Sequence, residues 1–307
     1  MAINSEKKGI STTANEPKGM PASLVINLVS ESTIPQQYLR GHYLHRLFLA
    51  LISAVDVNLS QSLQTHKHPA FTLSPLQISA QPQTVSARNL KFLLPRQQLE
   101  TTPFQYGNTS IPAGSHCWWR IAVLDDPLFG QLRPRLEQVA ARKPWYLGPT
   151  RLHITNLLPA NIPEWTSHNT YQQIYEQASD TNRHLTLQLL TPAVFHQGEQ
   201  ESPLPTRDAI FHGLRKCWNR YSGLVFAPDI ITPIVAKAFT LRTVAIPLGN
   251  NKTTVGCLGD LTFQISDTTD PLIVKRINAL TDFSRYCGIG HKTTLGLGLV
   301  RTVMATK

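Results

Sequence analysis

Strand and helix patterns follow one another along this chain in the same order twice. Each half gives a strand, an amphipathic helix, two strands, a second helix and a last strand. In the first helix, Leu39, Tyr43, Leu47 and Leu51 recur every four residues, which is typical of a helix with one buried face. The expected strands are 22–29, 71–78, 117–124 and 151–158, then 184–194, 238–247, 254–265 and 299–304, and the expected helices are 36–55, 126–141, 207–221 and 270–286.

This order predicts the fold class. A βαββαβ unit is the split βαβ arrangement of a ferredoxin-like domain, so the sequence predicts an α+β protein with two tandem ferredoxin-like (RRM-like) domains. Asp126 and Pro127 fit the start of the second helix, and Pro134 is unfavourable inside a helix, so a start near Arg133 is the alternative. The expected divisions are a flexible tail (1–20), an N-terminal domain (21–165) with a long hairpin or loop over 79–114, a linker (166–182) with one helical turn at 171–177, and a C-terminal domain (183–307).

A glycine-rich stretch lies between the last expected helix and the last expected strand. Residues 288–298 read Gly-Ile-Gly-His-Lys-Thr-Thr-Leu-Gly-Leu-Gly. Glycine permits positive φ values and close backbone approach, and successive N–H groups that turn inward can bind phosphate oxygens. The residues expected to bind a phosphate here are Gly288, Gly290, His291, Lys292, Gly296 and Gly298.

The same stretch does not fit two common phosphate-binding motifs. A Walker A loop needs Gly directly before Lys and a helix afterwards, whereas here His291 separates Gly290 from Lys292 and a strand follows. The dinucleotide fingerprint needs a third glycine where Thr293 stands. ATP and NAD are therefore not expected as ligands. The chain also lacks an aromatic RNP1 sequence, so base stacking on a sheet of the RRM kind is not supported.

The charge balance points to a polyanionic partner. The chain has 29 Lys and Arg against 19 Asp and Glu, a formal charge of +10. Such an excess favours nucleic acid or an anionic membrane surface, although it can also serve solubility alone. Apolar residues make up 41% of the chain, which is enough for packed cores.

The cysteines and the apolar segments indicate a cytoplasmic protein. No apolar run reaches membrane-spanning length, and the first twenty residues lack the apolar segment of a secretory signal. Four scattered cysteines without a Cys-x-x-Cys pair argue against a zinc site and a disulfide framework, and favour reduced, partly buried thiols.

The run His66-Lys67-His68 is the main candidate for proton transfer. Imidazole titrates near neutrality, so these histidines could act as a general acid or base, or they could be ordinary surface groups. A metal site is not favoured, because no acidic or cysteine partner has helical spacing nearby. The chain shows no Ser-His-Asp order or Gly-x-Ser-x-Gly elbow, and no loop that could line a pocket has paired carboxylates, so we expect neither a metal nor a cofactor.

The pattern Gly-Ile-Gly, five residues, Gly-Leu-Gly near the C-terminus resembles the repeat-cleaving CRISPR-associated endoribonucleases of the RAMP superfamily, the Cas six family. The resemblance runs from about Leu24 to the end of the chain. The other stretches that carry it are the helix 38–51, Phe71-Thr-Leu-Ser-Pro-Leu76, Leu190-Thr-Pro-Ala-Val-Phe195, Pro203-Leu-Pro205, Trp218-Asn-Arg-Tyr221 and Val255-Gly-Cys-Leu-Gly-Asp260.

The resemblance implies a metal-independent endoribonuclease that cuts CRISPR precursor RNA within the repeat. In that chemistry the 2′-hydroxyl attacks the adjacent phosphate, giving a 2′,3′-cyclic phosphate, a 5′-hydroxyl and mature guide RNAs. A histidine between the first helix and the Phe71 strand would be the general base or acid. His66 is the first choice by position and His68 the second, and His45 and His42 on the first helix are further options.

Basic residues are expected to hold the RNA. Lys67 would stabilise charge on the phosphate, with Arg40 or Arg46 as alternatives. The glycine-rich stretch would clamp the RNA backbone. A basic track for the repeat stem would use Arg133, Arg135, Arg142, Lys143 and Arg151, unless these residues form an ordinary solvated face.

Three functions follow from the resemblance and the charge. The first is the endoribonuclease, with CRISPR repeat RNA and CRISPR effector complex subunits as expected partners, no membrane, and a monomer or homodimer as the expected state. The second is a non-catalytic RAMP subunit that binds guide RNA in an effector complex. The third is a general double-stranded RNA-binding module.

Overall fold

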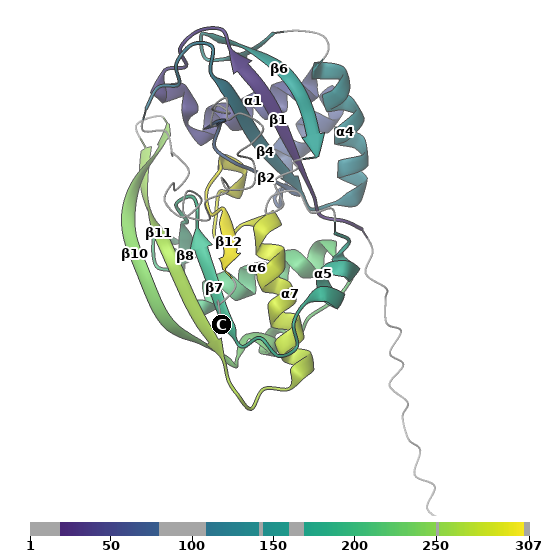
Figure 1. Ribbon diagram of the computed structural model, residues 1–307, viewed down its shortest axis with the longest axis vertical. Helices are drawn as coiled ribbons and strands as arrows, with labels where there is room; N and C mark the ends of the chain where they lie inside the picture. Colours follow the sequence, from purple (N-terminus) through teal and green to yellow (C-terminus); the bar gives the residue numbers. More distant parts are fainter. Residues whose placement is uncertain (1–18, 80–108, 141–143, 160–168, 250–251, 304–307) are drawn as a thin grey trace, which may run out of the picture.

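The computed structural model describes residues 19–79, 109–140, 144–159, 169–249 and 252–303. Two antiparallel sheets, each with helices packed against it, make an upper and a lower domain (Figure 1). The expected tail, apart from Gly19 and Met20, and residues 80–108 of the expected long loop lie outside the described residues. None of the helices in the described ranges combines the length and apolar character that crossing a membrane requires.

The first domain has the predicted ferredoxin-like topology. Its principal sheet has the order β2-β4-β1-β6-β5, and β3 also pairs with β4. Strands β1 and β2 run in the same direction with β4 antiparallel between them, which is the split βαβ arrangement. Its elements are β1 (Ala22–Ser30), η1 (Gln36–Leu39), α1 (Gly41–Ser53), α2 (Val57–Thr65), β2 (Phe71–Leu73), β3 (Gln77–Ile78), β4 (His116–Val123), α4 (Asp126–Ala140), β5 (Trp145–Leu147) and β6 (Thr150–Pro159).

The second domain repeats this topology. Its four-stranded sheet has the order β10-β11-β7-β12, and a separate hairpin pairs β8 with β9. The long hairpin of β10 and β11 rises along one side of the molecule towards α1 (Figure 1). The elements are α5 (Tyr171–Gln177), β7 (His184–Leu189), β8 (Phe195–Gln197), β9 (Gln200–Ser202), α6 (Arg207–Tyr221), η2 (Pro228–Ile231), β10 (Ile234–Gly249), β11 (Lys252–Ile265), α7 (Pro271–Cys287), η3 (Thr293–Leu295) and β12 (Val300–Val303).

Each domain has its own apolar core between the sheet and its helices. Phe48 and Trp119 are fully buried in the first core, and Phe211 and Phe263 are fully buried in the second. Burying a side chain of this size stabilises the fold by about 1.5–3 kcal/mol relative to leaving it exposed. The predicted helical turn at 171–177 is confirmed as α5, and Tyr171 packs in the second core.

The structure corrects the prediction of one helix over 36–55. The chain forms η1, then an extended residue, Arg40, then α1. The break has a tertiary cause, because a Cβ at Gly41 would lie 2.0 Å from the carbonyl oxygen of Leu295. Only glycine allows this approach between the two domains at the start of α1.

Two further boundaries differ from the sequence prediction. Helix α4 begins at Asp126 and contains Pro134, so the start at residue 126 is confirmed and the alternative start near Arg133 is wrong. Pro134 has no N–H to donate to the carbonyl oxygen of Gly130 four residues earlier, and it lies at a solvent-exposed position of the helix. The expected strand 71–78 divides into β2 and β3 around Pro75, because proline donates no ladder hydrogen bond.

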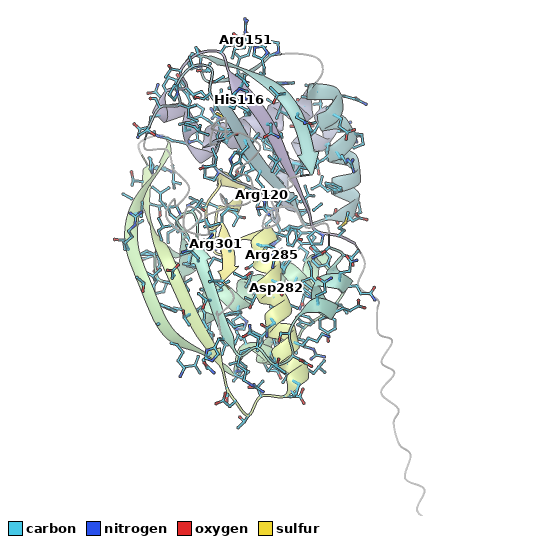
Figure 2. All side chains as sticks on the ribbon, viewed as in Figure 1. His116, Arg120, Arg151, Asp282, Arg285 and Arg301 are labelled. Carbon is cyan, nitrogen blue, oxygen red and sulfur yellow. The ribbon has the colours of Figure 1, made fainter. Side chains whose placement is uncertain are left out.

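Buried polar contacts fix the two domains to each other. Arg120 of β4 is 1% exposed, and its guanidinium donates to Ser23 Oγ at 2.7 Å and to the carbonyl oxygen of Arg285 at 2.8 Å. Thr72 donates to the carbonyl oxygen of Tyr286 at 2.9 Å. Figure 2 shows Arg120 and Arg285 where the upper domain meets the end of α7. The last turn of α7 is therefore anchored in the first domain.

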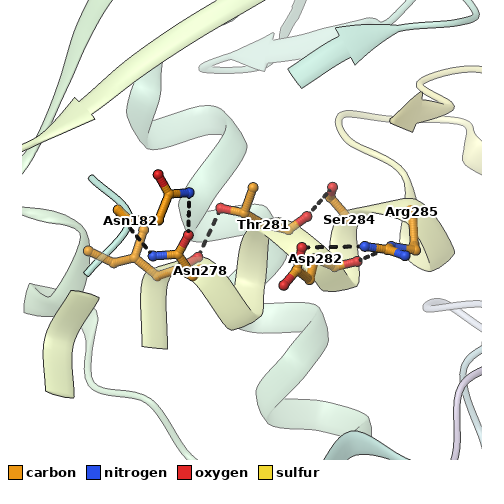
Figure 3. Close-up of polar contacts among 7 residues, drawn as sticks. Asn182, Asn278, Thr281, Asp282, Ser284 and Arg285 are labelled. Atoms are coloured by element: carbon orange, nitrogen blue, oxygen red, sulfur yellow. Dashed lines mark hydrogen bonds and ion pairs between the residues drawn. The ribbon is translucent and has the colours of Figure 1, made fainter. Parts of the chain in front are cut away.

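A second set of polar contacts holds α7 in its own domain (Figure 3). Asn278 Nδ2 donates to the carbonyl oxygen of Asn182 at 2.8 Å, and Asn182 Nδ2 donates to Asn278 Oδ1 at 3.1 Å. Arg285 pairs with Asp282 at 3.4 Å. Because the middle of α7 is held in its own domain and its last turn in the first domain, the segment that follows it starts from a defined position.

Candidate nucleic-acid interface

The two ends of the glycine-rich loop (288–298) lie side by side and are joined by a backbone hydrogen bond. After Cys287 ends α7, the N–H of Ile289 donates to the carbonyl oxygen of Gly298 at 2.8 Å. A Cβ at Gly298 would lie 1.9 Å from the carbonyl oxygen of Ile289, and the φ of Gly298 is +67°. Both observations require glycine at this position.

The middle of the loop reaches the first domain. Helix η3 packs against α1 and β2, and Gly41 of α1 touches the backbone of Leu295. The sequence places the loop between the last helix and the last strand, and the structure confirms that placement. The structure adds that the loop is part of the junction between the domains.

Several backbone N–H groups of the loop are satisfied inside the protein. The N–H of His291 donates to the carbonyl oxygen of Val194 at 2.7 Å, and that of Gly298 donates to the carbonyl oxygen of Pro192 at 2.9 Å. Just after the loop, the N–H of Leu299 donates to Thr191 Oγ1 at 2.9 Å. Because these N–H groups already donate to protein oxygens, they are not available to bind a phosphate together. The loop instead presents the side chains of the segment 291–294 to a cavity.

This cavity, of about 660 Å³, lies between the two domains. We call it the α6 cavity. Its walls are the segment 67–69 before β2, one face of α6, the start of β8, and residues 287–294. Segments from both domains are therefore required to build it.

Positive charge dominates the walls of the α6 cavity. Lys67 comes from the first domain, and Lys216 and Arg220 come from α6. Lys292 is paired with Glu201, and Asp208 is paired with Arg207 at 2.7 Å. Among the described residues, no ion pair neutralises Lys67, Lys216 or Arg220.

Four histidines also line the α6 cavity, and three have lowered pKa values. The Arg220 guanidinium lowers the pKa of His68, with smaller contributions from desolvation and Lys67. Partial burial lowers the pKa of His212, although Asp208 opposes that shift. Partial burial and the neighbouring His196 lower the pKa of His291, and the two rings lie 3.7 Å apart between centroids. These three imidazoles are therefore predominantly neutral at pH 7.5.

The histidines of α1 lie outside that cavity. His42 lies beneath the tip of the β10–β11 hairpin, where a Cβ at Gly249 would be 2.9 Å from its Cε1. Burial, Arg46 and Arg40 lower its pKa, and its buried Nδ1 has no hydrogen-bond partner within the described parts of the chain. His45 stacks on Phe71 with ring centroids 5.9 Å apart, and burial lowers its pKa.

The three consecutive residues expected in the catalytic site, His66, Lys67 and His68, do not all face the same cavity in the structure. His66 ends α2 as its exposed C-cap, and its Nδ1 accepts the N–H of His68 at 3.2 Å. His68 and Lys67 line the α6 cavity, whereas His66 does not. The structure thus brings Lys67 and His68 close to His291 and Lys292, residues more than two hundred positions later in the sequence.

The expected basic track is divided among separate ion pairs. Arg133 pairs with Glu137 at 3.2 Å, Arg135 with Asp56 at 2.8 Å, and Arg151 with Glu31 at 3.4 Å. Figure 2 shows Arg151 at the end of the upper domain away from Arg120. The remaining members, Arg142 and Lys143, lie outside the described residues.

The sequence interpretation missed the polar face of α6. His212, Lys216 and Arg220 recur every fourth residue, so they lie in one row along the helix and face the α6 cavity. The spacing is visible in the sequence, where the apolar residues Ile210, Leu214 and Trp218 form the opposite, buried row of the same helix. A basic row opposite an apolar row is the signal that would have found these residues.

The chain has two ferredoxin-like domains, and a glycine-rich loop of the second domain packs against the first. Cations without ion-pair partners among the described residues line the junction, which defines a two-domain protein suited to a polyanion such as RNA. Two family models agree with this class. The model of the CRISPR Cas6 N-terminal domain matches residues 20–176, and that of the CRISPR-associated endoribonuclease Cas6 matches residues 187–300. The chain belongs to the Cas6 family, and the resemblance seen in the sequence is confirmed. Membership in this family supports RNA cleavage and the processing of CRISPR repeat RNA.

Solved structures share the fold of the whole chain. A Cas6 product complex has 23% identity and a TM-score of 0.70, covering 92% of this chain and 100% of that chain. Thermus thermophilus Cas6 has 21% identity and a TM-score of 0.66, covering 93% and 99%. A Cas6-related protein from Pyrococcus furiosus has 12% identity and a TM-score of 0.57, covering 93% and 100%. At these identities the likeness shows the fold alone. No curated protein sequence matches the chain.

Proposed function

We propose that this protein is a metal-independent endoribonuclease that cleaves CRISPR precursor RNA within the repeat. A base removes the proton of a 2′-hydroxyl, and the 2′-oxygen bonds to the adjacent phosphorus. The bond from phosphorus to the 5′-oxygen breaks, and that oxygen takes up a proton. The products are a 2′,3′-cyclic phosphate and a 5′-hydroxyl. Within the described residues, no cluster of three or more His, Cys, Asp or Glu side chains could hold a metal ion.

His42 is the base that the geometry favours. The observation that carries this choice is its buried, unpartnered Nδ1 beneath the β10–β11 hairpin. A buried polar atom without a partner is rare in native proteins and calls for an explanation, and a substrate hydroxyl would supply the missing hydrogen bond. The lowered pKa keeps the His42 imidazole neutral near pH 7, which is the form that accepts a proton.

Nearby cations would stabilise the charge that develops on the phosphate. Arg40 and Arg46 lie close enough to His42 to lower its pKa. Fixed cations near developing negative charge lower the barrier for the reaction. Lys67, the first choice from the sequence, lies in the α6 cavity instead, where His42 is not part of the lining.

The other candidate histidines fit this role less well. His66 is exposed and its Nδ1 accepts a backbone N–H, so one ring nitrogen is already engaged. His45 has a lowered pKa but stacks on Phe71. His68 remains the strongest alternative, because it lines a cavity that contains several cations.

Single-turnover cleavage of a cognate repeat RNA in EDTA tests the proposal. We expect one cut, a 2′,3′-cyclic phosphate end, and a rate lower by about 10²–10⁴-fold in His42→Ala with RNA binding retained. His45→Ala, His66→Ala and His68→Ala are matched controls, because each removes one imidazole. Full activity of His42→Ala would reject this base, and loss of wild-type cleavage in EDTA would reject the metal-independent reaction. Tight binding of repeat RNA without any cleavage would favour the non-catalytic subunit.

A further inference from the structure

Side chains hold the β8–β9 hairpin (195–202) against the glycine-rich loop. The two strands of the hairpin form a small sheet of their own. The ring of His196 on β8 meets the ring of His291 edge to face, with centroids 3.7 Å apart, and Glu201 on β9 pairs with Lys292. None of these side chains belongs to the site proposed around His42, so the proton transfer does not explain these contacts.

Two neighbours bind the two oxygens of the Glu201 carboxylate. Lys292 Nζ donates to Oε1, and Thr254 Oγ1 of β11 donates to Oε2 at 2.6 Å. The side chains of Lys292 and Glu201 are 27% and 32% exposed, so salt screens this pair less than it screens fully exposed charges. Thr254 is buried, and its hydrogen bond keeps the carboxylate next to the ammonium group of Lys292.

The backbone of Lys292 also departs from the usual geometry. Among the residues that the structure describes, Lys292 is the one non-glycine residue with a positive φ, +61°. A residue with a side chain keeps this conformation only where surrounding contacts hold it, and such residues cluster at binding and catalytic sites. Here the N–H of Leu295 donates to the carbonyl oxygen of Lys292 at 2.8 Å, and Glu201 binds the side chain.

The ammonium group of Lys292 is accessible from the α6 cavity. Lys292 lines this cavity together with Lys67 and Arg220, whereas Glu201 is not part of the lining. An anion that these cations attract into the cavity therefore meets Lys292 while Glu201 remains bonded to Thr254 of β11.

We propose that Glu201 competes with RNA phosphates for Lys292, so that RNA binding breaks or weakens the pair of Glu201 and Lys292. A carboxylate and a phosphate both bind an ammonium group through anionic oxygens, and the two anions repel each other when both lie next to Lys292. Glu201 therefore lowers the affinity of the protein for any RNA that reaches Lys292. This inference rests on the proposed function, because it takes RNA as the ligand, and it identifies an autoinhibitory contact within the protein.

Fluorescence anisotropy tests the competition with the full chain and a labelled repeat RNA that carries a 2′-deoxy nucleotide at the cleavage position. Glu201→Gln removes the charge and keeps an oxygen that can accept the Thr254 hydroxyl. We expect this variant to bind the RNA about two- to fivefold more tightly, which is the range that an incompletely buried ion pair contributes. Lys292→Gln should bind more weakly than wild type, because it loses the phosphate contact.

Two comparisons separate the pair from a general effect of charge. Glu199→Gln removes a carboxylate from an exposed position of the same hairpin, where no ion pair is found among the described residues. It should change the affinity by less than about 1.5-fold, because salt screens an exposed charge that has no direct partner. In the Lys292→Gln background, Glu201→Gln should have no further effect, because the residue for which it competes is gone.

Three results would overturn the inference. They are unchanged or weaker binding in Glu201→Gln, an equal gain in Glu199→Gln, and a gain from Glu201→Gln that persists in the Lys292→Gln background.

The binding assay is independent of cleavage, because the 2′-deoxy nucleotide lacks the attacking hydroxyl. If wild type cleaves unmodified repeat RNA and Glu201→Gln binds as wild type does, the inference alone fails. If wild type does not cleave but the two substitutions show the expected coupling, the proposed reaction fails and the competition for Lys292 stands. Absence of RNA binding by the wild-type protein would reject both.

Discussion

Tyr221 of α6 donates its phenolic hydrogen to the carbonyl oxygen of His68 over 2.9 Å. Partial burial raises the pKa of Tyr221 to about 12, so the phenol keeps its proton throughout the neutral range. This bond connects a helix of the second domain to the loop of the first domain that carries Lys67 and His68. The shape of the α6 cavity therefore depends on a contact between the domains.

Replacing Tyr221 with Phe should loosen this loop without removing the ring. One hydrogen bond between neutral groups contributes about 0.5–1.5 kcal/mol to stability, so we expect a loss within that range in urea denaturation. Binding of single-stranded RNA should weaken by a few-fold. Thr243→Val removes a hydroxyl from an exposed position of β10 that does not line the cavity and serves as the control. Unchanged stability and unchanged binding would show that the bond does not position the loop.

Replacing Arg120 with Met should destabilise the junction between the domains. The substitution leaves Ser23 and the carbonyl oxygen of Arg285 without a donor, and each orphaned buried group costs about 1–3 kcal/mol. We expect a lower midpoint in urea, or two separate transitions if the domains uncouple. Thr72→Val, which removes one neighbouring hydrogen bond, should have a smaller effect. A single transition at the wild-type midpoint would contradict the assignment of Arg120 to this role.

Gly298→Ala tests whether the glycine-rich loop depends on close backbone approach. The added Cβ would lie 1.9 Å from the carbonyl oxygen of Ile289, and a non-glycine residue at positive φ costs about 1–3 kcal/mol before that clash is counted. Gly130→Ala in α4 meets no atom within 4 Å and should be neutral or stabilising by about 0.5–1 kcal/mol. Thermal unfolding of the two variants compares them directly. Equal melting temperatures would argue against a constrained loop.

RNA binding should strengthen as the pH falls from 8 towards 6. In the free protein His68, His212 and His291 have lowered pKa values because of Arg220, burial and neighbouring groups, so they are mostly neutral at pH 8. A bound phosphate favours the imidazolium form and raises these pKa values, so binding takes up protons. Affinity should therefore rise with falling pH and level off below the pKa values of the free protein.

Anisotropy at constant ionic strength measures this dependence. His68→Asn combined with His212→Asn should flatten the pH profile while Lys216 and Arg220 still give measurable binding. Affinity that rises with increasing pH would contradict protonation of these imidazoles in the complex.

The sequence by itself determined the order of the elements and the fold class. The apolar residues of α1, α6 and α7 repeat with the helical period, and this local pattern needs no knowledge of distant contacts. Two βαββαβ units then have few arrangements other than the split βαβ sheets observed in both domains. The break at Arg40 could not be predicted, because it depends on the backbone of Leu295 in the other domain. The sequence leaves two starts open for α4, because local rules do not say whether the helix accepts Pro134 at an exposed position.

Only the tertiary structure decided which candidate residues share a site. His66 and His68 are two residues apart, yet only His68 lines the α6 cavity, because the chain turns between them. His68 and His291 share that cavity, while His42 lies under a hairpin tip of the other domain. Spacing along a chain predicts which side chains lie on one face of a helix or strand. A site between two domains depends instead on how the two domain surfaces pack, which here is decided by contacts such as those of Arg120 and Gly41.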